Sequence, residues 1–154
     1  MRIFDCTTFY SEHLMMDIRF NILNEFVDKF IVCESTISHS GKKKKLNFDI
    51  NNYPKFKDKI NYIVIDEEPL NIIGDKNGLA EPYEQRSDSL KRIELSYDYM
   101  IKALSGVNDD DLIILSDNDE IPNLNSRQFK NSKKDIYIFK QLFFYYKFNL
   151  FYDL

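Results

Sequence analysis

Residues 109–122 read DDDLIILSDNDEIP, in which an apolar run, residues 112–115, stands between two groups of carboxylates. A short apolar run bounded by charged residues is typical of a buried β-strand. Side chains alternate along an extended backbone, so Asp117 and Asp119 are expected to point the same way, about 7 Å apart, with Asn118 pointing away. Two carboxylates this close repel each other unless a cation lies between them. The segment therefore predicts a strand followed directly by a candidate cation site.

The acids at this strand end favour a divalent cation. Hard carboxylate oxygens select Mg²⁺ or Mn²⁺, and magnesium is commonly held by one or two carboxylates together with phosphate oxygens of the substrate. The pair therefore predicts a metal that bridges the protein to a diphosphate. A calcium-binding EF-hand loop is excluded, because Pro122 and Gln128 stand where that loop needs Gly and Glu. Two alternatives stay open: acids that only solvate a turn before Pro122, and a phosphatase with Asp117 as aspartyl nucleophile.

The rest of the chain alternates strands and helices. Strands are expected at residues 3–9, 30–34, 60–66 and 111–117, with a fifth, aromatic strand within residues 135–148. Helices are expected within residues 12–30, where Leu14, Ile18, Ile22 and Phe26 form one apolar stripe, and from Leu90 to a glycine terminator at Gly106. This order predicts an α/β fold with a mainly parallel sheet flanked by helices, in a single domain over residues 1–154.

Polar residues follow the expected strands at the edge where such sheets bind ligands. Glu34, Asp66, Asp117 and Asp119 stand at or just past strand ends. In open α/β sheets, ligands bind outside the carboxyl ends of the strands. We therefore expect the functional site at this edge.

The composition is that of a globular domain. The chain has 154 residues, of which 44% are hydrophobic and 30% charged. The formal net charge of −4 argues against a nucleic-acid partner, because phosphate contacts need a basic surface. The local exception is residues 41–45, GKKKK, which form a solvated loop or a contact for a phosphate, an anionic substrate or an acidic membrane surface.

The sequence points to a cytoplasmic protein. The chain shows neither the apolar stretch of a signal peptide nor a run of the roughly 20 apolar residues that cross a membrane. Its two cysteines, Cys6 and Cys33, lie inside apolar runs and are expected to be buried free thiols, as suits a reducing compartment. Peripheral contact with a membrane stays open, and the sequence predicts no oligomeric state.

Several segments together resemble one enzyme family. They are IFDCTTFYSE with DIRFNIL, VDKFIVCES followed by HSGKKKKLNF, DDDLIILSDNDEIP, and IYIFKQLFFYYKFN, in this order. The combination resembles glycosyltransferase family 17, the family of the bisecting β-1,4-N-acetylglucosaminyltransferases. The resemblance runs along nearly the whole chain and is expected to correspond to the nucleotide-binding part of the family. A truncation at the C-terminus stays open.

The resemblance implies a fold of the GT-A kind and a metal-dependent, inverting glycosyltransferase. Such an enzyme would transfer N-acetylglucosamine from UDP-N-acetylglucosamine to a hydroxyl of a glycan acceptor, with Mn²⁺ or Mg²⁺ as cofactor. By this analogy Asp117 and Asp119 match the metal-binding acids, with Asn118 between them. The ends of the first strands make Thr7, Thr8 and Glu34 candidates for contacts to the donor.

A carboxylate is also expected to deprotonate the attacking hydroxyl. Glu120, next to the acid pair, is the candidate for that base. The alternative to an active enzyme is a truncated, non-catalytic module that binds a nucleotide or a glycan.

Overall fold

The computed structural model of the chain describes residues 1–74, 81–125, 135–144 and 151–152. They belong to two compact units, Met1–Asp119 and Glu120–Leu154. The second unit contains an antiparallel pair of short strands, β5 (Phe143–Phe144) and β6 (Phe151–Tyr152). The single domain predicted for residues 1–154 stays a prediction.

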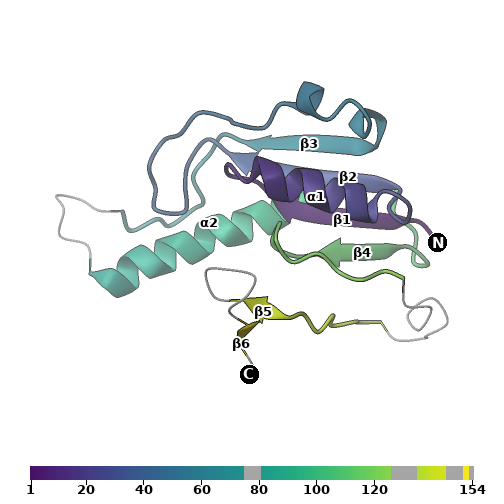
Figure 1. Cartoon of the computed structure of the whole chain (residues 1–154). Helices are drawn as coiled ribbons and strands as arrows, with labels where there is room; N and C mark the ends of the chain where they lie inside the picture. The colour runs from purple at the N-terminus through teal and green to yellow at the C-terminus, as the bar shows by residue number, and fades with distance from the viewer. Residues whose placement is uncertain (75–80, 126–134, 145–150, 153–154) are drawn as a thin grey trace. The chain divides into compact units, whose positions relative to one another are not determined.

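The first unit is built on a parallel sheet (Figure 1). Its strands are β1 (Ile3–Thr8), β2 (Lys29–Ser35), β3 (Ile60–Ile65) and β4 (Leu112–Leu115), in the spatial order β3-β2-β1-β4. Each neighbouring pair is parallel. The first four predicted strands and the α/β fold with a mainly parallel sheet are therefore confirmed.

The two faces of the sheet are covered by different helices. Helix α1 (His13–Leu23) packs on one face, where the ring of Phe20 meets Phe30 of β2 at 4.7 Å between centroids. Helix α2 (Pro82–Ala103) packs on the opposite face, where Met100 contacts a core that includes Ile31, the next residue of β2. Successive side chains of a strand point to opposite faces, so Phe30 and Ile31 each take one side. Two 3₁₀ turns, Ile50–Asn52 and Lys57–Lys59, lie between β2 and β3.

The predicted apolar stripe of the first helix is wrong. Leu14 and Ile22 are 72% and 51% exposed, and α1 instead buries Met16, Arg19, Phe20 and Leu23. The helix is turned in this way because Arg19 faces the sheet, where it pairs with Asp5 of β1. A buried arginine breaks the apolar pattern from which the stripe was inferred. The helix also ends at Leu23, before Phe26.

Helix α2 starts at Pro82, about two turns before the predicted Leu90. Its first turn contains Pro82, and Glu81 and Glu84 form a capping box that satisfies backbone N–H groups at this end. Gly106, three residues past the helix, has φ of 80°, as expected for a left-handed terminator.

The predicted fifth strand is wrong over residues 135–142, which form no strand. Ile138 there is 93% exposed. Apolar and β-branched residues predict a strand, but a strand needs a partner, and β5 pairs only at residues 143–144 among those described. Residues 145–148 of the prediction lie outside the described part of the chain.

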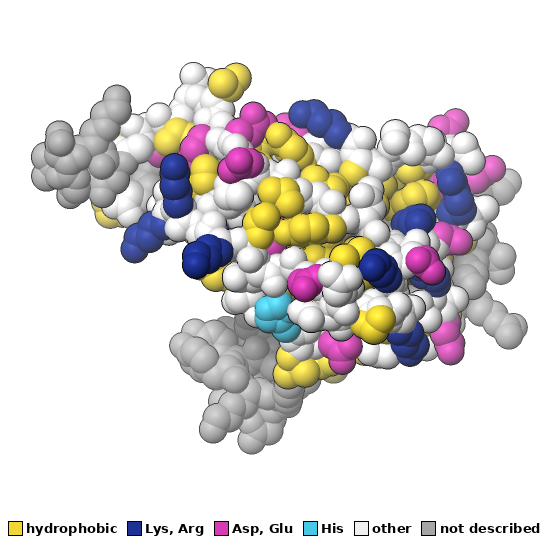
Figure 2. Space-filling model, turned by 90° about the horizontal axis from the view of Figure 1, so that it is seen from above, with side chains coloured by type: hydrophobic (Ala, Val, Ile, Leu, Met, Phe, Trp, Pro, Cys, Tyr) yellow, Lys and Arg dark blue, Asp and Glu magenta, His cyan; other side chains and the backbone are white. Residues whose placement is uncertain are grey.

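Both cysteines are buried and free, as predicted. In the described ranges, no helix combines the length and the apolarity that a membrane crossing requires. Figure 2 shows side chains of both charge signs around an apolar patch on the face seen from above.

Candidate functional site

A pocket of about 530 Å³ opens at the carboxyl ends of β1, β2 and β4. Its lining includes Thr8 at the end of β1, Ser35 at the end of β2, and the acid pair Asp117 and Asp119 after β4. The chain runs from β1 outward to β2 and β3 on one side and returns to β4 on the other. The pocket therefore lies where the strand order reverses, the place at which open α/β sheets bind ligands.

The structure brings together four of the predicted site residues. Thr8, Asp117, Asn118 and Asp119 all line this pocket. The carboxylates of the acid pair belong to exposed residues, so solutes can reach them.

Three other predicted residues lie elsewhere. Glu34 and Thr7 are buried, and each stands next to a strand residue that lines the pocket, so both side chains point to the opposite face of the sheet. Glu120 is the first residue of the second unit.

Beneath the acid pair, a buried arginine fixes the backbone. The Arg19 guanidinium donates to both carboxylate oxygens of Asp5, at 2.8 and 2.6 Å, and both side chains are almost fully buried. It also donates to the main-chain oxygens of Asp117 and Asn118, at 2.8 and 3.3 Å, and to the Ser116 hydroxyl at 2.8 Å. One side chain of α1 therefore joins β1 to the turn that carries the acids.

A second polar contact reaches the same turn from the β1–α1 loop. The Glu12 carboxylate accepts the Asn118 side-chain amide at 3.0 Å and the backbone N–H groups of Tyr10 and Ser11 at 2.9 Å each. Burial alone would raise the pKa of Glu12, but these donors outweigh it and the pKa is lowered. Glu12 is therefore held as a carboxylate, the form that accepts all three bonds.

Glu34 organises the loop that forms another wall. Burial would raise the pKa of its carboxyl, but donation from Lys44, from the backbone N–H groups of Asn47 and Phe48, and from the Tyr62 hydroxyl lowers it. The two backbone bonds measure 2.8 and 3.0 Å, and the Tyr62 bond 2.8 Å. The carboxylate is thus occupied by donors of the chain itself. Its role as a ligand contact stays a prediction.

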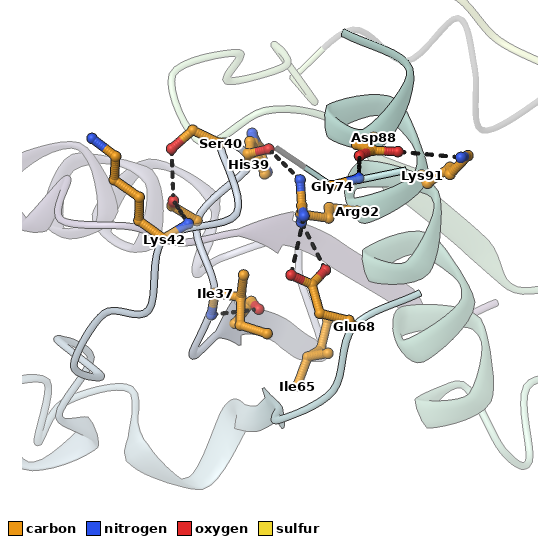
Figure 3. A network of polar contacts seen from close by, with 12 residues as sticks. Ile37, His39, Ser40, Lys42, Ile65, Glu68, Gly74, Asp88, Lys91 and Arg92 are labelled. Carbon is orange, nitrogen blue, oxygen red and sulfur yellow. Dashed lines mark hydrogen bonds and ion pairs between the residues drawn. The ribbon is translucent and has the colours of Figure 1, made fainter. Parts of the chain in front are cut away.

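The β2–β3 loop is locked onto α2 by Arg92 (Figure 3). The guanidinium donates to both carboxylate oxygens of Glu68, at 2.8 and 3.0 Å, and to the main-chain oxygen of His39 at 3.0 Å. Gly41 passes directly over it with φ of +82°, and a Cβ at this position would lie 2.8 Å from the Arg92 Nη2 atom. The positive φ therefore favours glycine at residue 41, and a Cβ there would have to displace the Arg92 guanidinium.

His39 of this loop lines the pocket together with the acid pair. Burial lowers the pKa of His39, the negative charge of Asp117 raises it, and Arg92 lowers it further, with a net decrease. The imidazole is therefore mainly neutral near pH 7. A second groove, of about 960 Å³, runs from His39 and Ser40 along the first turns of α2.

The acid pair suits a hard divalent cation shared with a substrate. Across the described residues, no three His, Cys, Asp or Glu side chains gather as a complete metal site. Two aspartates on an accessible pocket wall match the way Mg²⁺ is bound, through one or two carboxylates with phosphate oxygens and water completing the shell. The donor set of Asp117 and Asp119 therefore fits Mg²⁺ or Mn²⁺ when a diphosphate is bound with it.

The supporting residues Arg19 and Glu12 were missed from the sequence. A signal for Arg19 exists: Asp5 stands alone in the apolar strand IFDCTT, and Arg19 stands between apolar neighbours in MMDIRFNIL. Charges are almost never buried without a partner, so an acid and a base in two apolar segments predict a buried pair. Nothing local marks Glu12, whose partner is 106 residues away.

Comparisons with known proteins identify one enzyme family. The family model described as Glycosyltransferase family 17 matches residues 1–151. The chain is 28% identical over 125 residues to the beta-1,4-mannosyl-glycoprotein 4-beta-N-acetylglucosaminyltransferases of Rattus norvegicus and Homo sapiens. These alignments cover 79% of this chain and 22% of each relative, so the chain spans about a fifth of their length. No solved structure matches the chain.

Proposed function

The chain belongs to glycosyltransferase family 17, and we propose that it carries the donor site of a metal-dependent, inverting N-acetylglucosaminyltransferase. The donor would be UDP-N-acetylglucosamine, and the acceptor a hydroxyl of a glycan. The observation that carries the proposal is the presence of Asp117 and Asp119 on one wall of the pocket at the strand-order reversal. The parallel sheet also supports a fold of the GT-A kind.

The proposal gives each residue of the pocket a role. Asp117 and Asp119 would hold Mn²⁺ or Mg²⁺, which when bound offsets the negative charge that develops on the departing diphosphate. Thr8 lies at the end of β1 in the same pocket and offers a hydroxyl to the donor. Asn118 belongs to the same binding turn. Arg19 keeps the backbone of that turn in place before any ligand arrives.

Proton transfer needs a separate group. Deprotonation of the acceptor hydroxyl calls for a base within hydrogen-bond reach. Glu120, directly after the acid pair, stays the candidate for this role. Thr7 and Glu34 stay candidates for the donor site, although their burial favours supporting β1 and the β2–β3 loop.

The test is calorimetric titration of the chain with UDP in the presence of Mn²⁺. The parent is expected to bind, and Asp117→Ala and Asp119→Ala are expected to lose most of the metal-dependent affinity. Asp66→Ala is the matched control, because Asp66 also follows a strand end but does not line this pocket. No binding by the parent, or equal binding by the parent and both acid variants, would contradict the proposal.

A second candidate is a non-catalytic module that binds the nucleotide or a glycan. It needs only the pocket at the strand ends and the acid pair, and no base for the acceptor hydroxyl. The two candidates differ in turnover: an enzyme releases UDP from UDP-N-acetylglucosamine when glycan acceptors are supplied, and a binding module does not. The family match weighs against a phosphatase, which would instead hydrolyse a generic phosphomonoester through Asp117.

A further inference from the structure

The two acids of the candidate metal site share one short turn with Asn118, and the side chain of Asn118 has a partner of its own. Its amide donates to the Glu12 carboxylate at 3.0 Å. Glu12 lies between β1 and α1, and the turn follows β4, so the bond joins loops from the two halves of the sheet. Both residues of this contact line the pocket.

Glu12 is built to stay in place. The same carboxylate oxygen that receives Asn118 also accepts two backbone N–H groups of its own loop, at 2.9 Å each. Hydrogen bonds to a charged acceptor are the stronger ones in proteins. The Glu12 carboxylate is therefore held by its own loop, independently of its contact with Asn118.

The backbone on either side of Asn118 is held from the opposite face of the sheet. Arg19 donates to the main-chain oxygens of Asp117 and Asn118. With its backbone fixed by Arg19 and its middle side chain fixed by Glu12, the turn has little freedom to rotate. The carboxylates before and after Asn118 then keep one spacing at the pocket wall.

We infer that Glu12 is a positioning residue of the candidate metal site, acting through the Asn118 side-chain amide to hold Asp117 and Asp119 in the arrangement that binds a cation with a diphosphate. The inference rests on the proposed function. It assigns Asn118 a contact with the protein in place of one with the ligand. A metal site gains affinity when its ligands are fixed by such outer contacts.

The test exchanges the hydrogen-bond donor at residue 118 and the acceptor at residue 12. Asn118→Asp places a carboxylate against Glu12, and the repulsion should displace the turn. Glu12→Gln in the same chain supplies a new amide donor to that carboxylate while its oxygen still accepts the backbone N–H groups. The readout is UDP affinity with and without Mn²⁺, supported by urea unfolding of each variant to show that it is folded.

Asn118→Asp is expected to weaken Mn²⁺-dependent UDP binding by about tenfold or more, the size of one charge-assisted hydrogen bond. The double variant Glu12→Gln/Asn118→Asp is expected to recover most of that loss. The affinity of both variants for UDP without Mn²⁺ should differ little from that of the parent. Asn21→Ala, which removes an exposed side-chain amide of α1 that donates to Asp17, is the control and should bind as the parent does.

Two results would overturn the inference while leaving the proposed function intact. One is Asn118→Asp binding UDP and Mn²⁺ as tightly as the parent or more tightly, as expected of a direct metal ligand. The other is a double variant that binds no better than Asn118→Asp.

If the parent itself binds no UDP, the proposed function fails, and NMR decides the contact separately. Glu12→Ala is expected to shift the Asn118 side-chain amide signal and to speed its exchange with solvent. An unchanged signal would overturn the inference.

Discussion

The buried pair of Arg19 and Asp5 offers the sharpest test of how the fold supports the site. We consider Arg19→Met, which keeps an apolar stem of similar length and removes the guanidinium. Asp5 then remains as a carboxylate at about 1% exposure with no cation beside it. The main-chain oxygens of Asp117 and Asn118 lose a donor at the same time.

The loss of unfolding free energy expected for Arg19→Met follows from the burial of the ion pair. Removing one partner of a buried ion pair leaves an uncompensated charge and costs about 3–5 kcal/mol of unfolding free energy. For a domain of this size the loss corresponds to a fall in melting temperature of about 6–20 °C. Because replacing both charges is far less costly than removing one, Asp5→Asn/Arg19→Met should be more stable than Arg19→Met alone, by about 1 kcal/mol or more.

The assay is urea unfolding of the parent, Arg19→Met and the double variant, followed by circular dichroism at one temperature. A loss below about 1 kcal/mol for Arg19→Met would refute the reasoning, because that is the size of an exposed pair. So would a double variant no more stable than Arg19→Met. Either result would mean that water reaches Asp5 when the guanidinium is removed.

Two further predictions concern the β2–β3 loop. Gly41→Ala should lose more stability in urea unfolding than Gly106→Ala. Each substitution puts a side chain on a residue with a positive φ, at a cost of about 1–2 kcal/mol. Only at residue 41 would the new Cβ also lie 2.8 Å from a guanidinium nitrogen. Equal losses would mean that the arginine moves aside. The pKa of Glu34 is lowered from 4.5 in the fold, so its stabilisation is present above about pH 4.5 and is lost as the pH falls through the folded pKa. Glu34→Gln should therefore flatten the acid limb of stability against pH, and an unchanged limb would contradict this.

The strands could be predicted because their signal is local. The runs FIVC and LIIL are apolar over their whole length, and β2 is buried from Phe30 to Glu34. A parallel strand covered on both faces needs no alternation, so the run itself identifies it. The acid pair could also be placed, because a residue that directly follows such a strand must lie at its carboxyl end.

The orientation of α1 could not be predicted in the same way. Two overlapping stripes, one through Leu14 and Ile22 and one through Met16 and Phe20, fit a helical period in this sequence. Which of them is buried depends on Arg19, and its burial depends on Asp5 in another element. A pairing between elements leaves no periodic trace in either one, so the local pattern pointed to the wrong face.

The same pairing explains why the supporting residues were harder to find than the acids. Asp117 and Asp119 need only a strand before them to reach the pocket. Arg19 acts on that turn from 98 residues away, across the sheet order that brings β1 beside β4. A contact of this kind can be predicted only once the topology is known, because β1 and β4 become neighbours through the reversal of strand order itself. The reversal that makes room for a ligand therefore also brings Arg19 to the turn that would bind it.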